Sequence, residues 1–119
     1  MTALGPNIKL TIARDAREPL RAAMTEVFGA THASPRDDFD VYTLGDGSHL
    51  GAYCVDAALA AESAKLGAWI ELVVDDVAAA RAALARRGIE PFEYFDKEHD
   101  YIQLPGGQVV RLAATEARR

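Results

Sequence analysis

The chain has 119 residues, of which 50% are hydrophobic and 26% charged, as in an ordinary globular domain. A formal net charge of −5, with no basic stripe in the sequence, disfavours binding to nucleic acid. No apolar run reaches the roughly 18 residues of a membrane span, no signal-peptide pattern opens the sequence, and the single Cys54 fits a reducing compartment, so we expect a cytoplasmic protein.

The first half of the sequence predicts a strand, a helix and a hairpin. Polar and apolar residues alternate over 7–12, which is typical of a strand with one buried face. Asp15 and Glu18 have the spacing of a capping box, and Gly29 ends the apolar periodicity of the helix that follows. The predicted strands lie at 7–12, 39–44 and 48–55, with a turn at 45–47 and a short extra strand near 31–33.

The second half of the sequence predicts a similar set of elements. Asp76 is a good N-cap for a helix over 77–87, and Gly88 supplies its left-handed end. Before these residues, the Ala-rich segment 56–66 has helical propensity and is expected to connect two modules. The other predicted elements are a strand at 69–74, an extended segment at 89–95, a strand at 101–104, a turn at 105–107 and a strand at 108–113.

Equivalent features recur in the two halves at an offset of roughly sixty residues. The matched positions are Asp15 and Asp76 at the helix starts, Gly29 and Gly88 at the helix ends, and Gly47 and Gly107 in the hairpin turns. A steady offset across two helices and two hairpins indicates a structural duplication.

Two stretches of the second half, residues 69–77 and 104–112, resemble the vicinal oxygen chelate superfamily, which includes glyoxalases, extradiol dioxygenases and bleomycin-resistance proteins. The first half matches that pattern more loosely. The resemblance implies an α+β fold of tandem βαβββ modules that form a curled mixed sheet around a cleft, often in a homodimer. The expected single domain, 1–119, would comprise module one at about 5–55, a helical connection at 56–67 and module two at 68–114.

Metal-dependent members of that superfamily place His, Gln or Glu on the first strand of each module and Glu on each final strand. The four corresponding positions of this sequence are Asn7, Gly51, Trp69 and Arg111. Glycine has no donor atom, tryptophan is not a ligand, and arginine is a fixed cation that would repel a metal ion. We therefore expect no metal at these positions and no cofactor.

Strand alternation predicts which side chains would line the cleft. The predicted ligand-binding residues are Trp69, Arg111, Glu71, Lys9, Asn7, His49, Tyr53, Tyr101 and Gln103. Aromatic walls with a few convergent polar groups are the usual composition of a small-molecule site. Other interpretations stay open, because a strand tryptophan is often a core residue and Lys9, Glu71 and Arg111 could form a solvated ion network. His49 and His99 are expected to be solvated, and Cys54 is expected to point into the core.

These residues predict a metal-independent small-molecule-binding protein that sequesters a toxic or aromatic compound. The main alternative is a lyase, an isomerase or a dioxygenase-like enzyme with Glu71 as base and Arg111 stabilising an oxyanion. A third interpretation is a structural module whose cleft is filled by its own side chains. The expected partners are a small molecule and a second copy of the chain, without nucleic acid or membrane. Three questions stay open: which ligand is bound, whether the cleft forms within one chain or across a dimer, and whether His49 or His99 binds a metal at another place.

Overall fold

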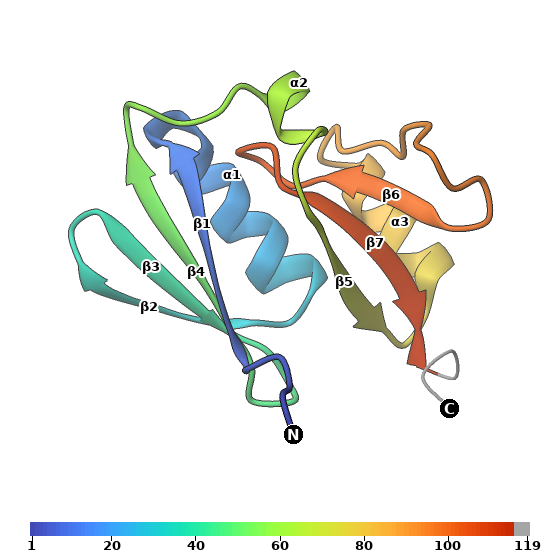
Figure 1. The fold of residues 1–119 in the computed structure, drawn as a ribbon, viewed down its shortest axis with the longest axis horizontal. Coiled ribbons are helices and arrows are strands. Elements are labelled where there is room, and N and C mark those ends of the chain that lie inside the picture. Colours follow the sequence, from blue (N-terminus) through green and yellow to red (C-terminus); the bar gives the residue numbers. More distant parts are fainter. Residues whose placement is uncertain (116–119) are drawn as a thin grey trace. The chain divides into compact units, whose positions relative to one another are not determined.

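A computed structural model of the chain describes residues 1–115. The chain divides into two compact units, Met1–Ala58 (unit 1) and Leu59–Arg119 (unit 2). Each unit contains one curled sheet and one principal helix (Figure 1). Within the described residues, no helix is long and apolar enough to cross a membrane.

Unit 1 is a four-stranded sheet with a helix packed on one face. Its elements are β1 (Asn7–Ala13), α1 (Arg17–Ala22), β2 (Thr31–Arg36), β3 (Phe39–Thr43) and β4 (His49–Val55). The strand order is β1-β4-β3-β2, in which β1 runs parallel to β4 and the other pairs are antiparallel. The alternation over 7–12 is confirmed, because Leu10 and Ile12 are buried whereas Asn7 and Lys9 are exposed.

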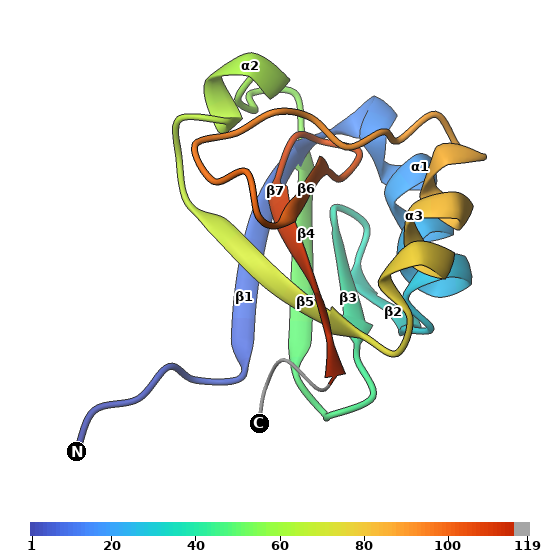
Figure 2. The same cartoon turned by 90° about the vertical axis from the view of Figure 1, so that its right-hand side faces the viewer.

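Unit 2 has the same plan with one strand fewer. Its elements are α2 (Ala61–Ala64), β5 (Trp69–Val74), α3 (Val77–Ala85), β6 (Asp100–Gln103) and β7 (Val109–Ala114). The strand order is β5-β7-β6, with β5 parallel to β7, and α3 runs along one side of this sheet (Figure 2). Leu84 of α3 is fully buried, as are Ile102 and Val110 of the sheet, so this side forms the core of unit 2.

The recurrence seen in the sequence corresponds to equivalent backbone features in the two units. In both, the first strand pairs in parallel with the last strand. Gly29 and Gly88 end their helices with φ angles of 68° and 76°. Gly47 and Gly107 adopt φ angles of 87° and 106° in the two hairpin turns, a region that favours glycine.

The helix of unit 1 differs from the prediction. A 3₁₀ turn at Arg14–Ala16 precedes α1, a π-helical stretch at Ala23–Val27 follows it, and no side chain caps either of the first two segments. The predicted capping box of Asp15 and Glu18 is therefore wrong. In unit 2, by contrast, the Asp76 carboxylate accepts a hydrogen bond from the Ala79 amide at 3.0 Å, as predicted.

Three other predictions need correction. The Ala-rich segment 56–66 forms only the single turn α2, because helix propensity without a buried apolar face rarely sustains a longer helix. Residues 89–95 form no regular strand, and Phe92 donates a single backbone hydrogen bond to Tyr101. The extra strand of unit 1 is longer than expected, at Thr31–Arg36. The complete βαβββ order thus occurs in unit 1, and unit 2 has βαββ.

Candidate functional site

The side of the unit 1 sheet that faces away from α1, here called the pocket face, is built by three strands in register. Asn7 lies beside His49, Lys9 beside Gly51, and Thr11 beside Tyr53 on β1 and β4. On the next strand, β3, the neighbours of His49, Gly51 and Tyr53 are Thr43, Val41 and Phe39. The register therefore brings together all four candidate residues of this half: Asn7, Lys9, His49 and Tyr53.

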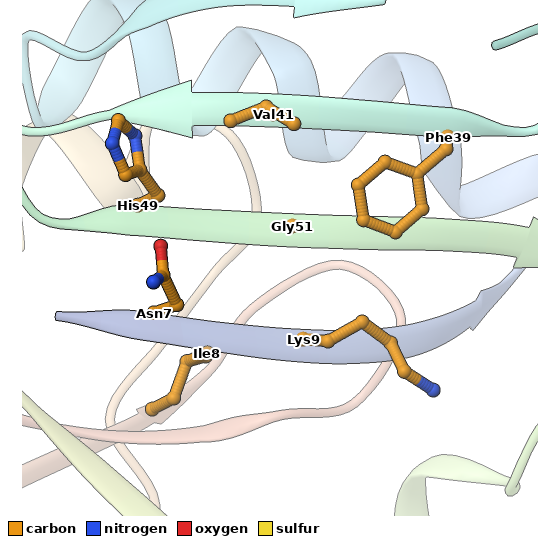
Figure 3. A pocket seen from close by; sticks show the side chains of 7 residues that line it. All are labelled: Asn7, Ile8, Lys9, Phe39, Val41, His49 and Gly51. Atoms are coloured by element: carbon orange, nitrogen blue, oxygen red, sulfur yellow. The ribbon is translucent and has the colours of Figure 1, made fainter. Parts of the chain in front are cut away.

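The pocket face contains a pocket of about 410 Å³. Its lining residues, which Figure 3 shows in close-up, are Asn7, Ile8, Lys9, Phe39, Val41, His49 and Gly51. A volume of a few hundred Å³ with apolar walls and a few polar groups is typical of small-molecule sites. Three of the candidate residues line this pocket, while Tyr53 lies in the neighbouring row.

The pocket depends on the absence of a side chain at Gly51. A Cβ atom at this position would lie 2.6 Å from the Cζ atom of Phe39, closer than two carbon atoms can approach. The Phe39 ring therefore lies across the β4 backbone, where Figure 3 shows it beside Gly51. Together with Val41, this ring supplies an apolar wall.

The polar residues of the pocket face have partners within it. The Lys9 ammonium donates to the Thr11 hydroxyl at 2.9 Å and lies 5.8 Å from the centre of the Tyr53 ring. The Nδ1 atom of His49 and the Thr43 hydroxyl are 3.0 Å apart. All of these contacts are solvent-exposed, so a ligand could replace them at little cost.

In unit 2, three candidate residues form one cluster, here called the Trp69 cluster: Trp69, Glu71 and Arg111. The Arg111 guanidinium lies 4.3 Å from the centre of the Trp69 ring, within the range of a cation–π contact. Its Nε and Nη2 atoms donate to one oxygen of Glu71 at 3.0 and 2.8 Å. These hydrogen bonds to Glu71 raise the pKa of Arg111.

The two remaining candidates of unit 2 are engaged by the protein itself. Tyr101 is only 1% exposed, and burial raises the pKa of its hydroxyl. The Gln103 amide nitrogen donates to the carbonyl oxygens of Ala61 and Gly107, both at 2.8 Å. Gln103 therefore fastens α2 to the turn after β6, and its two N–H groups are already used.

Sequence reasoning missed the residues that cover Tyr101. The rings of Tyr94 and Phe95 lie 5.0 and 6.0 Å from that of Tyr101, and the Tyr101 hydroxyl donates to Asp96 at 3.1 Å. The aromatic composition of residues 92–95 was a signal for this packing. We interpreted this segment as an extended strand, which would place alternate rings on opposite sides. That interpretation did not predict that the rings pack together on Tyr101.

Sequence reasoning also missed a buried ion cluster on the helix-facing side of unit 1. Asp40 is fully buried and accepts two hydrogen bonds of 2.8 Å from Arg17 of α1. Ser34 donates to the same carboxylate at 2.5 Å, and a His32 nitrogen lies 3.1 Å away. The Arg17 guanidinium holds the pKa of Asp40 well below its usual range. This cluster attaches α1 and β2 to the centre of the sheet.

The resemblance aligns four residues of this chain with metal ligands, and these residues do not fit a divalent cation. Asn7 offers one neutral oxygen, and Gly51 offers none. The Trp69 ring faces the Arg111 guanidinium, so this pair presents a positive charge instead of an electron-pair donor. Elsewhere in residues 1–115, no group of three His, Cys, Asp or Glu side chains is placed to hold a metal ion.

The fold is that of glyoxalases and bleomycin-binding proteins. A "possible glyoxalase" from Bacillus cereus matches with a TM-score of 0.67 and 19% identity, over 93% of this chain and 99% of that one. The bleomycin-binding protein of Streptomyces verticillus, solved with copper(II)-bleomycin, gives 0.61 and 16%, over 96% and 98%. A variant of the fosfomycin resistance protein FosX from Listeria monocytogenes, solved with Mn(II) and a dihydroxypropylphosphonic acid, gives 0.74 and 13%, over 99% and 98%.

These likenesses confirm, for the fold, the resemblance to the vicinal oxygen chelate superfamily that the sequence indicated. At such low identities they define the fold and leave the activity to be argued from the site. A comparison with protein-family models gives no match, and neither does a comparison with curated proteins.

Proposed function

We propose that this chain is a metal-independent small-molecule-binding protein of the glyoxalase and bleomycin-resistance type, which captures an apolar or aromatic compound without changing its bonds. The observation that carries this proposal is the pocket of about 410 Å³ around Gly51. It combines an apolar wall with hydrogen-bonding groups from Asn7, Lys9 and His49, and it does not need a metal ion.

In unit 2 we propose Trp69, Arg111 and Glu71 as further ligand-binding residues. The indole offers a stacking surface, and the guanidinium suits a carboxylate or carbonyl group. Sequestration is supported by proteins of the same fold, since one of them is a bleomycin-binding protein. The ligand of this chain is defined only by class: a compound with an apolar or aromatic body and a hydrogen-bond acceptor.

The enzyme alternative assigns Glu71 as a general base. The Nε and Nη2 atoms of Arg111 both donate to one oxygen of Glu71, at 3.0 and 2.8 Å, so this oxygen is already engaged within the free protein. The geometry therefore favours binding over proton abstraction. Turnover that is lost in Glu71→Gln would favour the enzyme instead.

We also propose a cytoplasmic homodimer. Large apolar side chains exposed on the single chain support pairing, among them Leu66 at 90% and Leu59 at 68% exposure. The expected interface buries at least about 1,000 Å² in total. Sedimentation equilibrium should give twice the monomer mass at micromolar concentration, and a monomer mass would contradict this part of the proposal.

Mass spectrometry of natively isolated protein tests the proposed function. A compound released on denaturation should be enriched close to one equivalent, and Gly51→Ala should lose it, because the new methyl group displaces the Phe39 ring. Gly45→Ala is the matched control, since a Cβ at that position meets nothing within 4 Å. Equal recovery from both variants would exclude this pocket as the site.

A further inference from the structure

Four groups of unit 2 surround the carboxylate of Asp96: an imidazole, a hydroxyl, a guanidinium and a backbone amide. One oxygen lies 2.5 Å from Nδ1 of His99, 3.1 Å from the Tyr101 hydroxyl and 3.8 Å from Nη1 of Arg111. The other oxygen accepts the Glu98 amide at 2.8 Å. The Asp96 side chain is only 19% exposed, so these donors surround a largely enclosed anion.

The segment that delivers Asp96 to this place, residues 92–99, has no regular secondary structure. It is fastened by the Phe92 amide on the Tyr101 carbonyl at 3.0 Å and by the Tyr94 hydroxyl on the Lys65 carbonyl at 2.7 Å. Phe95 packs on Tyr101 and nevertheless stays 72% exposed. The Phe95 ring is thus only a weak anchor of this segment, because little of its surface is removed from water.

We propose that Arg111, Tyr101 and His99 form a carboxylate-binding site beside Trp69, which Asp96 occupies in the free protein and from which a small aromatic carboxylate displaces it. This inference rests on the proposed function and specifies the ligand of its unit 2 residues as an aromatic acid. Asp96 is attached to the chain, so it binds as an intramolecular competitor and reduces the apparent affinity for an external anion.

The distances support exchange at this site. The contact between Arg111 and Asp96 is an ion pair at 3.8 Å, longer than a hydrogen bond, whereas Glu71 holds the same guanidinium at 2.8 Å. Arg111 thus has one close carboxylate, Glu71, and one more distant carboxylate, Asp96, whose short contacts are with other groups. At Arg111, the distant carboxylate is the one a ligand would replace. The neighbouring Trp69 ring, 4.3 Å from the guanidinium, gives the aromatic body of the ligand a surface.

Quenching of the single tryptophan tests the site without a ligand. Asp96→Asn removes the internal anion, so the anionic quencher iodide should reach Trp69 about twice as effectively, while neutral acrylamide should change less. Glu98→Gln is the matched control, because it removes the same charge from an exposed residue of the same segment. Circular dichroism of each variant checks that the fold is kept.

Calorimetric titration with benzoate, and with neutral benzamide, tests the ligand class. Asp96→Asn should tighten benzoate binding about tenfold and leave benzamide unchanged, because the competing carboxylate is gone. Phe95→Ala loosens the segment without changing a charge and should tighten benzoate binding in the same direction. If Asp96→Asn and Phe95→Ala match Glu98→Gln in quenching and affinity, Asp96 is a loop anchor and the inference is wrong. The pocket around Gly51 could still bind its own ligand in that case, so the two failures are distinguishable.

Discussion

In unit 1 the sheet face opposite the helix holds a pocket, whereas in unit 2 the residues at the equivalent strand positions are engaged by the protein itself. Gly51 leaves room for the Phe39 ring and a pocket beside it. At the corresponding strand of unit 2, Arg111 contacts Trp69, Glu71 and Asp96. The same backbone plan thus supports two different surfaces, and the side chains of the last strand decide which one results.

On the helix-facing sides of the two sheets the distribution of charge is reversed: unit 1 is charged there and unit 2 is apolar. Unit 2 buries apolar side chains there, including Leu84 and Ile102. Unit 1 adds a buried carboxylate, Asp40, which Arg17 neutralises and His32 contacts. Unit 1 therefore combines a mainly apolar pocket wall with a charged helix attachment, and unit 2 combines an apolar core with a charged sheet face.

Removing Asp40 should have the largest effect on stability. Asp40→Ala leaves Arg17 without its partner and should lower the free energy of unfolding by about 3 kcal/mol, the lower end for a broken buried ion pair. The control Asp38→Ala disrupts a more exposed pair with Arg36 and should lower the free energy of unfolding much less, because solvent screens that pair. Urea denaturation at pH 7 measures both, and equal effects would contradict the assigned role of Asp40.

The same cluster predicts the acid response of unit 1. Because the pKa of Asp40 is lowered in the folded state, its contribution is fully present above the unfolded pKa of about 3.9. The contribution is lost as the pH falls below that value. The stability difference between the wild type and Asp40→Asn should therefore shrink between pH 4 and pH 2, which denaturation at several pH values would detect.

The Trp69 cluster predicts a selective loss of anion binding. Arg111→Met should weaken benzoate binding by about 2 kcal/mol, as expected for a charge-assisted hydrogen bond, and should leave benzamide binding nearly unchanged. Trp69→Phe should weaken both by about 1 kcal/mol if the indole stacks on the ligand. Calorimetry in the Asp96→Asn background measures both variants. A blue-shifted Trp69 emission that resists acrylamide would instead identify a core residue.

The helix starts give the smallest expected difference. Asp76→Ala removes a side-chain cap from α3 and should lower the unfolding free energy by about 1 kcal/mol. Asp15→Ala, at the matched position of unit 1, should change it by less than about 0.5 kcal/mol because no side chain caps that helix. Thermal denaturation of the two variants compares them directly, and equal shifts would show that Asp15 also acts as a cap.

Local patterns in the sequence predicted much of the fold. The alternation over 7–12, the cap at Asp76 and the glycines at the helix ends depend on neighbours within a few residues, and the structure confirms them. The spacing of Asp15 and Glu18 predicted a capping box as clearly as the sequence predicted the cap at Asp76. It failed because this chain starts the helix with a 3₁₀ turn and directs Arg17 to Asp40.

The candidate site could be predicted only where strand register determines it. Register places Asn7 beside His49 and Glu71 beside Arg111, as alternation implied. The contacts of Asp96 with Tyr101 and Arg111 involve a segment without regular structure. Such a segment has no sequence periodicity from which these contacts could be predicted. The ligand-binding role of these residues and the shared cleft stay predictions.

We expect the pocket face of unit 1 to be the accessible binding surface of the free protein. Amide NMR spectra recorded during titration with 2-naphthol, a neutral aromatic probe, test it most directly. We predict chemical-shift changes at Lys9, Val41 and Gly51, with the Trp69 indole signal unchanged while Asp96 keeps its place. Changes confined to Trp69 and Arg111, with none around Gly51, would contradict the claim.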